Sequence, residues 1–291
     1  MTFRHPARGG VFYTVPLRMR ARHHESFDVH VDTGSGKLWL YSSHCASPAC
    51  KGMKGYSPGG PAFNTGEKKT THFADGTRIA GTWATDYVEA AGKRMEFLLA
   101  DRGSATLPPG VVGGLGLGLP KQGKAHRVLW AHNQRRVCAL CFGTHGLGAM
   151  LALPPVANDG SHLTIGDYRW EVRLSAIEHA GRVLMLNRRV LLDSGTVASV
   201  APPPDVEAFF SFFYQNVAEA TAGEWTLVFA GGARVHLPEL FSFRRHGHHE
   251  RSLHASPSGF NSTWIFGLDV LTHLHTVFDA DKRMVGLASR L

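Results

Sequence analysis

Two acidic tetrapeptides carry the residues of this chain that are best suited to chemistry. Residues 32–35 and residues 193–196 both read Asp-(Thr/Ser)-Gly-(Ser/Thr), with one copy in each half of the sequence. A single copy would be weak, because Asp followed by a hydroxyl residue and Gly is common in turns. Two copies, each after an apolar run, indicate that a duplicated fold brings the carboxylates of Asp32 and Asp193 face to face. Such a pair can perform general acid and base catalysis without a metal ion or a covalent intermediate.

The residues before each tetrapeptide predict the strands that position it. Residues 27–31 alternate between apolar and polar types, which is typical of a half-buried strand, and residues 190–192 are all apolar, which suits a buried strand. The Gly of each tetrapeptide allows the chain to turn tightly where the strand ends. We expect the hydroxyl groups of Ser35 and Thr196 to donate hydrogen bonds to the carboxylates and to fix their orientation.

The repeat extends beyond the tetrapeptides. Residues 111–113 and residues 265–267 each consist of two apolar residues followed by Gly, at similar distances after the two acidic motifs. An acidic loop followed by an apolar-apolar-Gly segment in each half indicates an internal duplication. We expect Gly113 and Gly267 to pass close to the acidic loops, since neither has a side chain.

With these motifs in this order, the chain resembles the pepsin-like aspartic proteases. The matching segments include residues 32–39, 193–196, 264–267, 276–279 and 285–288, and the resemblance runs from about Gly10 to Leu291. It implies an all-β fold with a few short helices, in which two duplicated β lobes each supply one aspartate to a central cleft. It also implies a peptide or protein substrate, whose scissile carbonyl is attacked by a water held between Asp32 and Asp193.

The resemblance assigns roles to further residues of this sequence. The catalytic residues would be Asp32 and Asp193, supported by Thr33, Gly34, Ser35, Ser194, Gly195 and Thr196. The flap and substrate-binding residues would be Phe73, Asp75, Gly76 and Trp39, and a small disulfide loop would join Cys45 to Cys50.

The predicted flap departs from the family pattern. Residues 70–79 read as a β-hairpin with an Asp-Gly turn at Asp75 and Gly76. Phe73 stands where family members usually carry a tyrosine, so the hydroxyl that would meet Trp39 is absent. We expect a hydrophobic lid that lacks one positioning hydrogen bond.

Other departures keep a second function open. Residues 20–25 are basic where the family usually has a turn, and residues 165–193 and 222–258 are shorter than the family leads us to expect. The alternative to an active endopeptidase is therefore a catalytically weak or inactive relative that binds a peptide or protein in the same cleft. Because the chain already contains both acidic motifs, we expect a monomer.

Length and composition agree with two β lobes. The chain has 291 residues, of which 43% are hydrophobic, with 33 Gly and 15 Pro for strands and turns. Linker-like residues at 154–160 predict lobes at residues 1–158 and 159–291. Helical patterns are limited to residues 204–214 and residues 269–274.

The net charge limits the classes of partner that we expect, and the cysteines indicate the cellular compartment. The net charge is +8, but Lys and Arg are scattered rather than gathered in a basic tract, so we expect no nucleic-acid partner. We expect no cofactor and no metal site, and we interpret Cys138 and Cys141 as buried structural thiols rather than as a metal or redox pair. No membrane-spanning run and no signal sequence are visible. The family and a Cys45–Cys50 bridge nevertheless predict a secreted protein or one in an endomembrane or vacuolar lumen.

Overall fold

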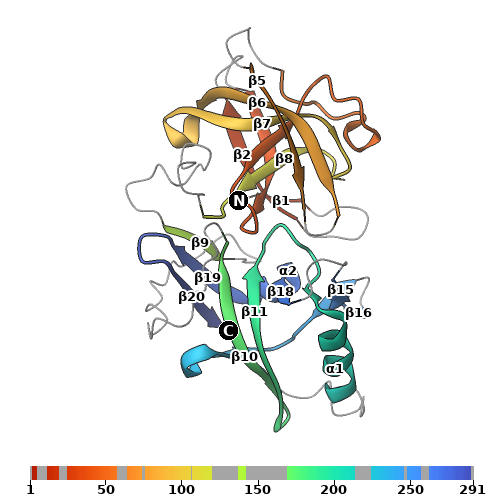
Figure 1. The fold of residues 1–291 in the computed structure, drawn as a ribbon, viewed down its shortest axis with the longest axis vertical. Coiled ribbons are helices and arrows are strands. Elements are labelled where there is room, and N and C mark those ends of the chain that lie inside the picture. Colours follow the sequence, from red (N-terminus) through yellow and green to blue (C-terminus); the bar gives the residue numbers. More distant parts are fainter. Residues whose placement is uncertain are drawn as a thin grey trace. The chain divides into compact units, whose positions relative to one another are not determined.

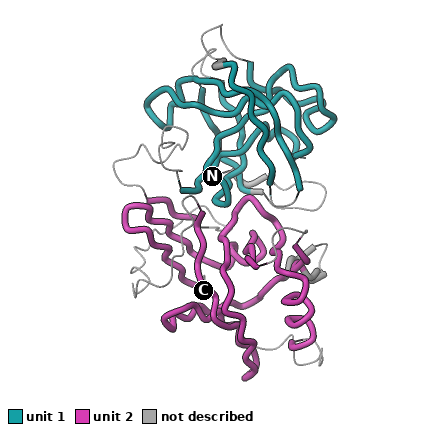
Figure 2. Tube along the Cα trace, viewed as in Figure 1, with its two compact units in different colours: residues 1–134 teal, residues 135–291 magenta. Residues whose placement is uncertain are grey.

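The computed structural model describes residues 2–4, 12–19, 25–57, 64–73, 76–105, 107–119, 137–141, 169–213, 224–245, 248–256 and 262–289. The chain divides into two compact units, residues 1–134 and residues 135–291 (Figure 2). Each unit has its own β-sheet and its own buried core.

The described part of the first unit is built on one sheet of eight strands in the order β1-β2-β3-β8-β4-β7-β6-β5. A further pairing joins β2 to β6, so six of the strands form a closed ring of pairings. The strands are β1 (Thr2–Arg4), β2 (Phe12–Met19), β3 (Glu25–Asp32), β4 (Leu38–Tyr41), β5 (Asn64–His72), β6 (Arg78–Val88), β7 (Lys93–Gly103) and β8 (Val111–Gly116). Two short 3-10 helices, η1 (Pro48–Cys50) and η3 (Glu89–Ala91), lie in its loops.

The second unit carries a seven-stranded sheet in the order β14-β13-β10-β11-β18-β12-β17, where the structure describes it. Two smaller sheets accompany it, β15-β16 and β20-β19-β9. The first group of strands is β9 (Val137–Cys141), β10 (Glu171–His179), β11 (Arg182–Leu192), β12 (Val200–Ala201), β13 (Trp225–Phe229) and β14 (Arg234–Leu237). The second group is β15 (Ser242–Arg245), β16 (His248–Arg251), β17 (His254–Ala255), β18 (Thr263–Phe266), β19 (Leu274–Asp279) and β20 (Met284–Ser289). The helical segments are α1 (Pro203–Phe213), α2 (Leu268–Leu271) and the 3-10 turn η6 (Ala230–Gly232).

The same strand arrangement occurs in both units. In the first, β3 pairs antiparallel with β2 and parallel with β8, and β8 pairs antiparallel with β4. In the second, β11 pairs antiparallel with β10 and parallel with β18, and β18 pairs antiparallel with β12. The predicted internal duplication is therefore a duplication of topology, and each copy brings the strand that precedes an acidic motif against a strand from far along the chain.

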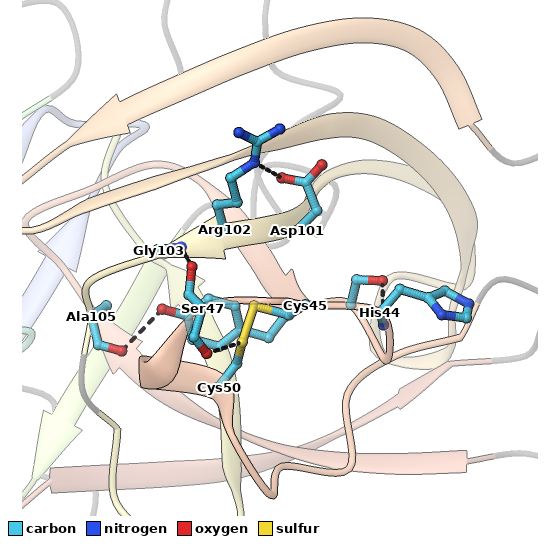
Figure 3. The surroundings of a disulfide bond; sticks show 10 residues. His44, Cys45, Ser47, Cys50, Asp101, Arg102, Gly103 and Ala105 are labelled. Atoms are coloured by element: carbon cyan, nitrogen blue, oxygen red, sulfur yellow. Dashed lines mark hydrogen bonds and ion pairs between the residues drawn. A yellow bond between two sulfur atoms is a disulfide. The ribbon is translucent and has the colours of Figure 1, made fainter.

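The core of the first unit is aromatic and includes a disulfide. Trp39, Tyr41 and Trp83 are almost fully buried, and Cys50 packs in the same cluster. The predicted Cys45–Cys50 disulfide is confirmed, and Figure 3 shows it within the loop that follows β4. The adjacent Ser47 hydroxyl accepts a hydrogen bond from the backbone N–H of Gly103 at 3.0 Å, which ties the disulfide loop to β7.

The second unit buries one face of its sheet under α1. The strands β10 and β11 form a long twisted hairpin, and α1 contacts β11 (Figure 1). Phe209 and Phe213 of α1 pack on Trp225, and His179 stacks on the same indole with ring centroids 3.9 Å apart. Apolar residues on one face of α1 thus meet the aromatic residues of β10 and β13.

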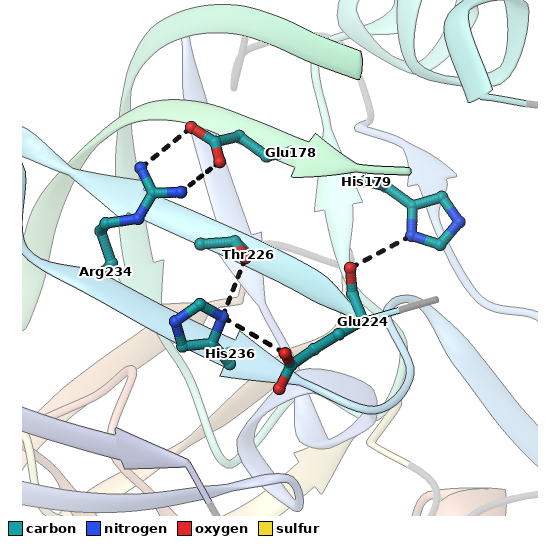
Figure 4. A network of polar contacts seen from close by, with 6 residues as sticks. All are labelled: Glu178, His179, Glu224, Thr226, Arg234 and His236. Atoms are coloured by element: carbon teal, nitrogen blue, oxygen red, sulfur yellow. Dashed lines mark hydrogen bonds and ion pairs between the residues drawn. The ribbon is translucent and has the colours of Figure 1, made fainter. Parts of the chain in front are cut away.

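Polar contacts tie the strands β10, β13 and β14 together across that sheet (Figure 4). Arg234 of β14 donates two hydrogen bonds to the Glu178 carboxylate of β10. The hydroxyl of Thr226 lies 3.0 Å from His236 Nδ1, and Nδ1 of His179 lies 3.3 Å from the Glu224 carbonyl oxygen. The Arg234–Glu178 pair is exposed to solvent, so it adds little to stability.

The predicted mainly β fold with few helices is confirmed. The first predicted helix appears as α1, one residue earlier at each end than residues 204–214. The second, predicted at residues 269–274, is only α2, because the chain turns at Thr272 and Leu274 already pairs in β19. In the described part of the chain no helix has the length and apolar character to cross a membrane.

The predicted lobe boundary at residues 158 and 159 lies outside the described residues and stays a prediction. The strand β9, which precedes it, pairs with β19 of the second unit. The basic residues 20–24 and the linker residues 154–160 also lie outside the described part.

Replacing both Cys45 and Cys50 with Ser should lower the free energy of unfolding of the first unit by about 2 kcal/mol. The bridge closes a short loop, with a sequence separation of 5, so the entropy that it removes from the unfolded chain is modest. Urea unfolding under non-reducing conditions measures the change. The control is Cys138→Ser, which removes a free thiol. A double variant as stable as this control would contradict the prediction.

Candidate active site

The first acidic loop leaves β3 and returns to the sheet as β4. Asp32 is the last residue of β3, and its side chain is buried, with 5% of the residue exposed. Ser35 donates to both carboxylate oxygens, from its backbone N–H to Oδ1 at 3.0 Å and from its hydroxyl to Oδ2 at 2.7 Å. Thr33 is fully buried beside it, and Gly34 makes the turn. The loop therefore orients the Asp32 carboxylate before any ligand binds.

The second acidic loop orients its carboxylate in nearly the same way. Asp193 follows β11 directly and is 8% exposed. The backbone N–H of Gly195 donates to Asp193 Oδ1 at 2.8 Å, and the hydroxyl of Thr196 donates to Oδ2 at 2.7 Å. Ser194 is buried, like Thr33 in the first loop. In each loop one oxygen accepts a backbone N–H and the other accepts the hydroxyl three residues after the aspartate, as the sequence predicts for Ser35 and Thr196.

A glycine from a distant strand contacts each loop, but one of the two predicted glycines was wrong. Gly113 pairs with Val29, while the residue opposite Asp32 is Gly116. A Cβ atom on Gly116 would lie 2.2 Å from the backbone nitrogen of Lys37, and one on Gly267 would lie 2.8 Å from the carbonyl oxygen of Thr196. The apolar-apolar-Gly pattern identified the correct strand, β8. The register of the pairing between β8 and β3 determines which glycine lies against the loop.

Backbone hydrogen bonds fasten both loops at equivalent points. The N–H of Gly118 donates to the Ser35 carbonyl at 2.7 Å, and the N–H of Leu268 donates to the Thr196 carbonyl at 2.9 Å. Ser35 and Thr196 are also the residues that donate hydroxyl hydrogen bonds to the aspartates. Each unit therefore holds one oriented, buried carboxylate at the end of a strand. A carboxyl group held in this way can act as a general acid or base.

Comparison with known proteins agrees with this geometry. A family model described as eukaryotic aspartyl protease matches residues 22–135. Pepsin-2B of Gadus morhua is 26% identical over 306 residues, which cover 91% of this chain and 92% of that protein. Chymosin of Bos taurus is 23% identical over 313 residues, which cover 92% of this chain and 78% of that protein. Cathepsin E of Rattus norvegicus is 25% identical over 215 residues, which cover 63% of this chain and 52% of that protein. The chain is therefore similar to the pepsin-like aspartic proteases, and the match to the family model covers residues 22–135.

The hairpin between β5 and β6 carries the residues that the resemblance predicts to form a flap. The N–H of Phe73 donates to the Thr77 carbonyl at 2.9 Å, and the N–H of Gly76 donates to the Phe73 carbonyl at 3.1 Å. Gly76 has φ of 84°, which suits the predicted turn, while Asp75 lies outside the described residues. The Phe73 and Trp39 ring centroids are 6.3 Å apart, so the two rings are in contact, while the role of Phe73 in a flap stays a prediction.

Because Phe73 has no hydroxyl, it cannot accept a hydrogen bond from the indole of Trp39. Trp39 is 1% exposed, and its Nε1–H has no hydrogen-bond acceptor among the residues that the structure describes. A buried donor without an acceptor loses its hydrogen bonds to water and gains none in return. The sequence predicts this loss from Phe73 alone, and the geometry around the indole agrees with it.

Some residues near the loops had no predicted role. Lys37 follows the first acidic loop, and its Nζ donates to the Thr71 hydroxyl of β5 at 3.0 Å, which links the loop to the flap arm. His30 lies two residues before Asp32 on the same face of β3, with its ring edge toward Trp39 and Nδ1 3.0 Å from the Gly113 carbonyl oxygen. A histidine and a lysine on either side of an acidic motif were the signal in the sequence.

Cys138, the remaining candidate for metal or redox chemistry, lacks the properties that such chemistry needs. Cys138 of β9 has a free thiol, and burial raises its pKa to about 11. Reactive and metal-binding cysteines need the thiolate and usually have a lowered pKa. The described residues contain no group of three or more His, Cys, Asp or Glu side chains that could hold a metal ion.

The most important residue without a predicted role is Asp269 of α2. It is fully buried, and it accepts hydrogen bonds from the N–H and the hydroxyl of Ser199 at 3.0 and 2.6 Å and from the hydroxyl of Ser252 at 2.5 Å. Burial raises the pKa of Asp269 above its ordinary 3.8, although the hydrogen bonds from both serines oppose the shift. An acidic residue inside the apolar run 265–271 was the only sign of it in the sequence.

Phe73→Tyr should stabilise the first unit by about 0.5–1.5 kcal/mol, the usual net gain from one intramolecular hydrogen bond. The new hydroxyl would accept the hydrogen bond from Trp39 Nε1, which has no acceptor among the described residues. Chemical unfolding followed by tryptophan fluorescence measures the gain. Phe73→Leu serves as the control, because it removes the aromatic contact without adding a hydroxyl. A tyrosine variant no more stable than the wild type would show that the hydroxyl points away from Trp39.

Asp269→Asn should remove part of the pH dependence of unfolding. A carboxyl group with a raised pKa in the folded state stabilises the fold below its unfolded pKa, 3.8, and loses that contribution as the pH rises through the folded value. The stability of the wild type relative to the variant should therefore fall as the pH rises from about 3.5 to about 7. Urea unfolding at several pH values measures the difference, in which the other titrating groups cancel. A difference that is constant with pH would contradict the raised pKa.

Proposed function

We propose that this chain is an aspartic-type endopeptidase in which Asp32 and Asp193 activate a water molecule between them. The observation that carries the proposal is the matched pair of acidic loops, each of which holds its carboxylate by one N–H and one hydroxyl at nearly equal distances. A protein that only binds peptides would need neither this orientation nor its duplication.

The proposed chemistry follows from two carboxyl groups that share one proton. Two carboxylates held close together cannot both ionise easily, so the pair titrates as a unit. Aspartic proteases are themselves the best-known case of this sharing. The ionised partner would take a proton from the water, which attacks the scissile carbonyl, and the protonated partner would donate a hydrogen bond to the carbonyl oxygen. We expect an acid optimum because the shared proton is required.

The proposed substrate is an extended peptide with bulky apolar side chains around the scissile bond. Phe73 is partly exposed on the predicted flap and packs on the buried Trp39, so it would offer an apolar surface to such a chain. The charge of +8 is spread along the sequence, which favours a peptide rather than a nucleic acid as the partner. Because both motifs lie in one chain, we propose that the monomer is the active form.

The proposed compartment is oxidising. The Cys45–Cys50 disulfide would persist in a secreted protein or in an endomembrane or vacuolar lumen, whereas cytosolic thiol systems reduce most such bonds. An acidic lumen would also suit a dyad that needs one proton.

One observation favours a second function, a catalytically weak relative that binds a peptide in the same place. Phe73 cannot supply the hydroxyl that Trp39 lacks, so the flap has one fewer hydrogen bond to hold it in a closed position. A flap that closes poorly would reduce the rate of cleavage more than the affinity for a peptide.

Asp32→Asn and Asp193→Asn should each lower the rate of cleavage of a denatured protein substrate at least about a hundred-fold, because general acid–base catalysis contributes about 10²–10⁴-fold. Cleavage is measured from about pH 3 to about pH 7, with and without pepstatin. The wild-type activity should appear in acid and should be blocked by the inhibitor.

The matched control is Asp28→Asn, on the same strand as Asp32 but partly exposed and outside the acidic loop. It should leave cleavage unchanged. A folded wild-type chain that binds pepstatin without cleaving any substrate would support the peptide-binding alternative. Cleavage that survives in either dyad variant would overturn the proposed mechanism.

A further inference from the structure

Asp269 holds the end of the second acidic loop. Two of its hydrogen bonds come from Ser199, which lies between the loop and β12. The Ser199 hydroxyl also accepts a hydrogen bond from the Gly267 N–H at 3.0 Å, and the Ser199 carbonyl accepts one from the backbone N–H of His254 at 2.9 Å. A further donor, Ser252, lies just before β17. The carboxylate of Asp269 thus joins the loop, the glycine that contacts it and a neighbouring strand.

The backbone of α2 connects the same anchor to the residue that orients Asp193. The N–H of Asp269 donates to the Val197 carbonyl at 3.2 Å, and the N–H of Leu268 donates to the Thr196 carbonyl at 2.9 Å. Thr196 in turn donates its hydroxyl to Asp193 Oδ2 at 2.7 Å. A shift of α2 relative to the loop would therefore move Thr196 and turn the Asp193 carboxylate.

Stability alone does not account for an acid at this position. Asp269 is fully buried between Leu268 and Val270, which are also fully buried. Burying a carboxyl group costs solvation free energy that an apolar side chain would not lose, so a residue selected only for packing would be apolar. In the first unit, none of the three residues that follow the glycine at the loop, Leu117, Gly118 and Leu119, is acidic.

We infer that Asp269 is a positioning residue for the second catalytic aspartate: through Ser199 and Ser252 it fixes the loop that aims the Asp193 carboxylate. The inference rests on the proposed function, since it concerns the geometry of the proposed dyad. Asp269 touches no substrate in this scheme. A misplaced Asp193 would slow the chemical step more than it would weaken substrate binding, because alignment of the reacting groups matters most in the transition state.

The test compares Asp269→Asn with Asp205→Asn. Asp205 is also a buried acid of the second unit, and it accepts three hydrogen bonds, from Arg188 Nε at 2.7 Å, from Arg188 Nη2 at 2.9 Å and from Trp264 Nε1 at 2.8 Å. Burial alone would raise the pKa of Asp205, but the hydrogen bonds and charge of Arg188, with the hydrogen bond from Trp264, lower it overall. Asp205 lies at the start of α1 and makes none of the contacts that hold the acidic loop, so it controls for the loss of a buried charge.

At a temperature where both variants are folded, Asp269→Asn should lower kcat about tenfold or more and change KM by less than about twofold. Asp205→Asn should lower stability at least as much but leave kcat within about twofold of the wild type. Ser252→Ala, which removes only one hydrogen bond, is the milder variant if Asp269→Asn does not fold, and it should lower kcat to a smaller degree. Equal kcat values for the Asp269 and Asp205 variants would overturn the inference.

Hydrogen exchange separates this inference from the proposed function. The amides of Thr196 and Leu268 should exchange faster in Asp269→Asn than in the wild type or in Asp205→Asn, whether or not the protein cleaves peptides. If the wild type has no dyad-dependent activity but these amides still lose protection, the proposed function fails while the hold of Asp269 on the loop stands. Unchanged exchange in Asp269→Asn would overturn the inference by itself.

Discussion

The close approach of a glycine-bearing strand to each acidic loop is the constraint on which this structure depends. Gly116 and Gly267 come so near to the loop backbone that a single Cβ atom would clash with it. The parallel pairs β3–β8 and β11–β18 bring these glycines into place, and both pairs join strands far apart in the sequence. The contacts that fasten the acidic loops are therefore non-local, and they depend on the tertiary structure of each unit.

The fold also has to accommodate several buried acids, and it does so by different means. Asp32 and Asp193 accept hydrogen bonds from backbone N–H groups and from hydroxyls, which orient them without a neighbouring cation in those contacts. Asp205 is paired with a guanidinium, and its pKa is lowered despite burial. Asp269 has serine donors, and burial prevails, so its pKa is raised. The partner therefore decides the favoured charge state of each buried carboxyl group.

The predicted flap is where this chain departs most clearly from the pepsin-like pattern that it resembles. An indole N–H buried without a described acceptor is an uncommon cost in a folded protein, and Phe73, whose ring contacts Trp39, has no hydroxyl to accept its hydrogen bond. Lys37, which ties the flap arm β5 to the first acidic loop, provides a polar link between the same two elements at another point. The first acidic loop and the flap arm are thus joined by a hydrogen bond from Lys37 to Thr71 rather than by one to a tyrosine hydroxyl.

The sequence by itself determined the chemistry of each loop and the mainly β class of the fold. Alternating and apolar runs predict strands, Asp-Gly at residues 75 and 76 predicts a hairpin, and a hydroxyl three residues after each aspartate predicts its orientation, because these are local relations within a few residues. The Cys45–Cys50 bridge was likewise within reach through the family resemblance. Only the tertiary structure decided that Gly116 rather than Gly113 meets the first loop, and that Asp269 accepts hydrogen bonds from Ser199 and Ser252. These contacts join residues distant in sequence, and their partners depend on strand register and packing, which local patterns do not specify.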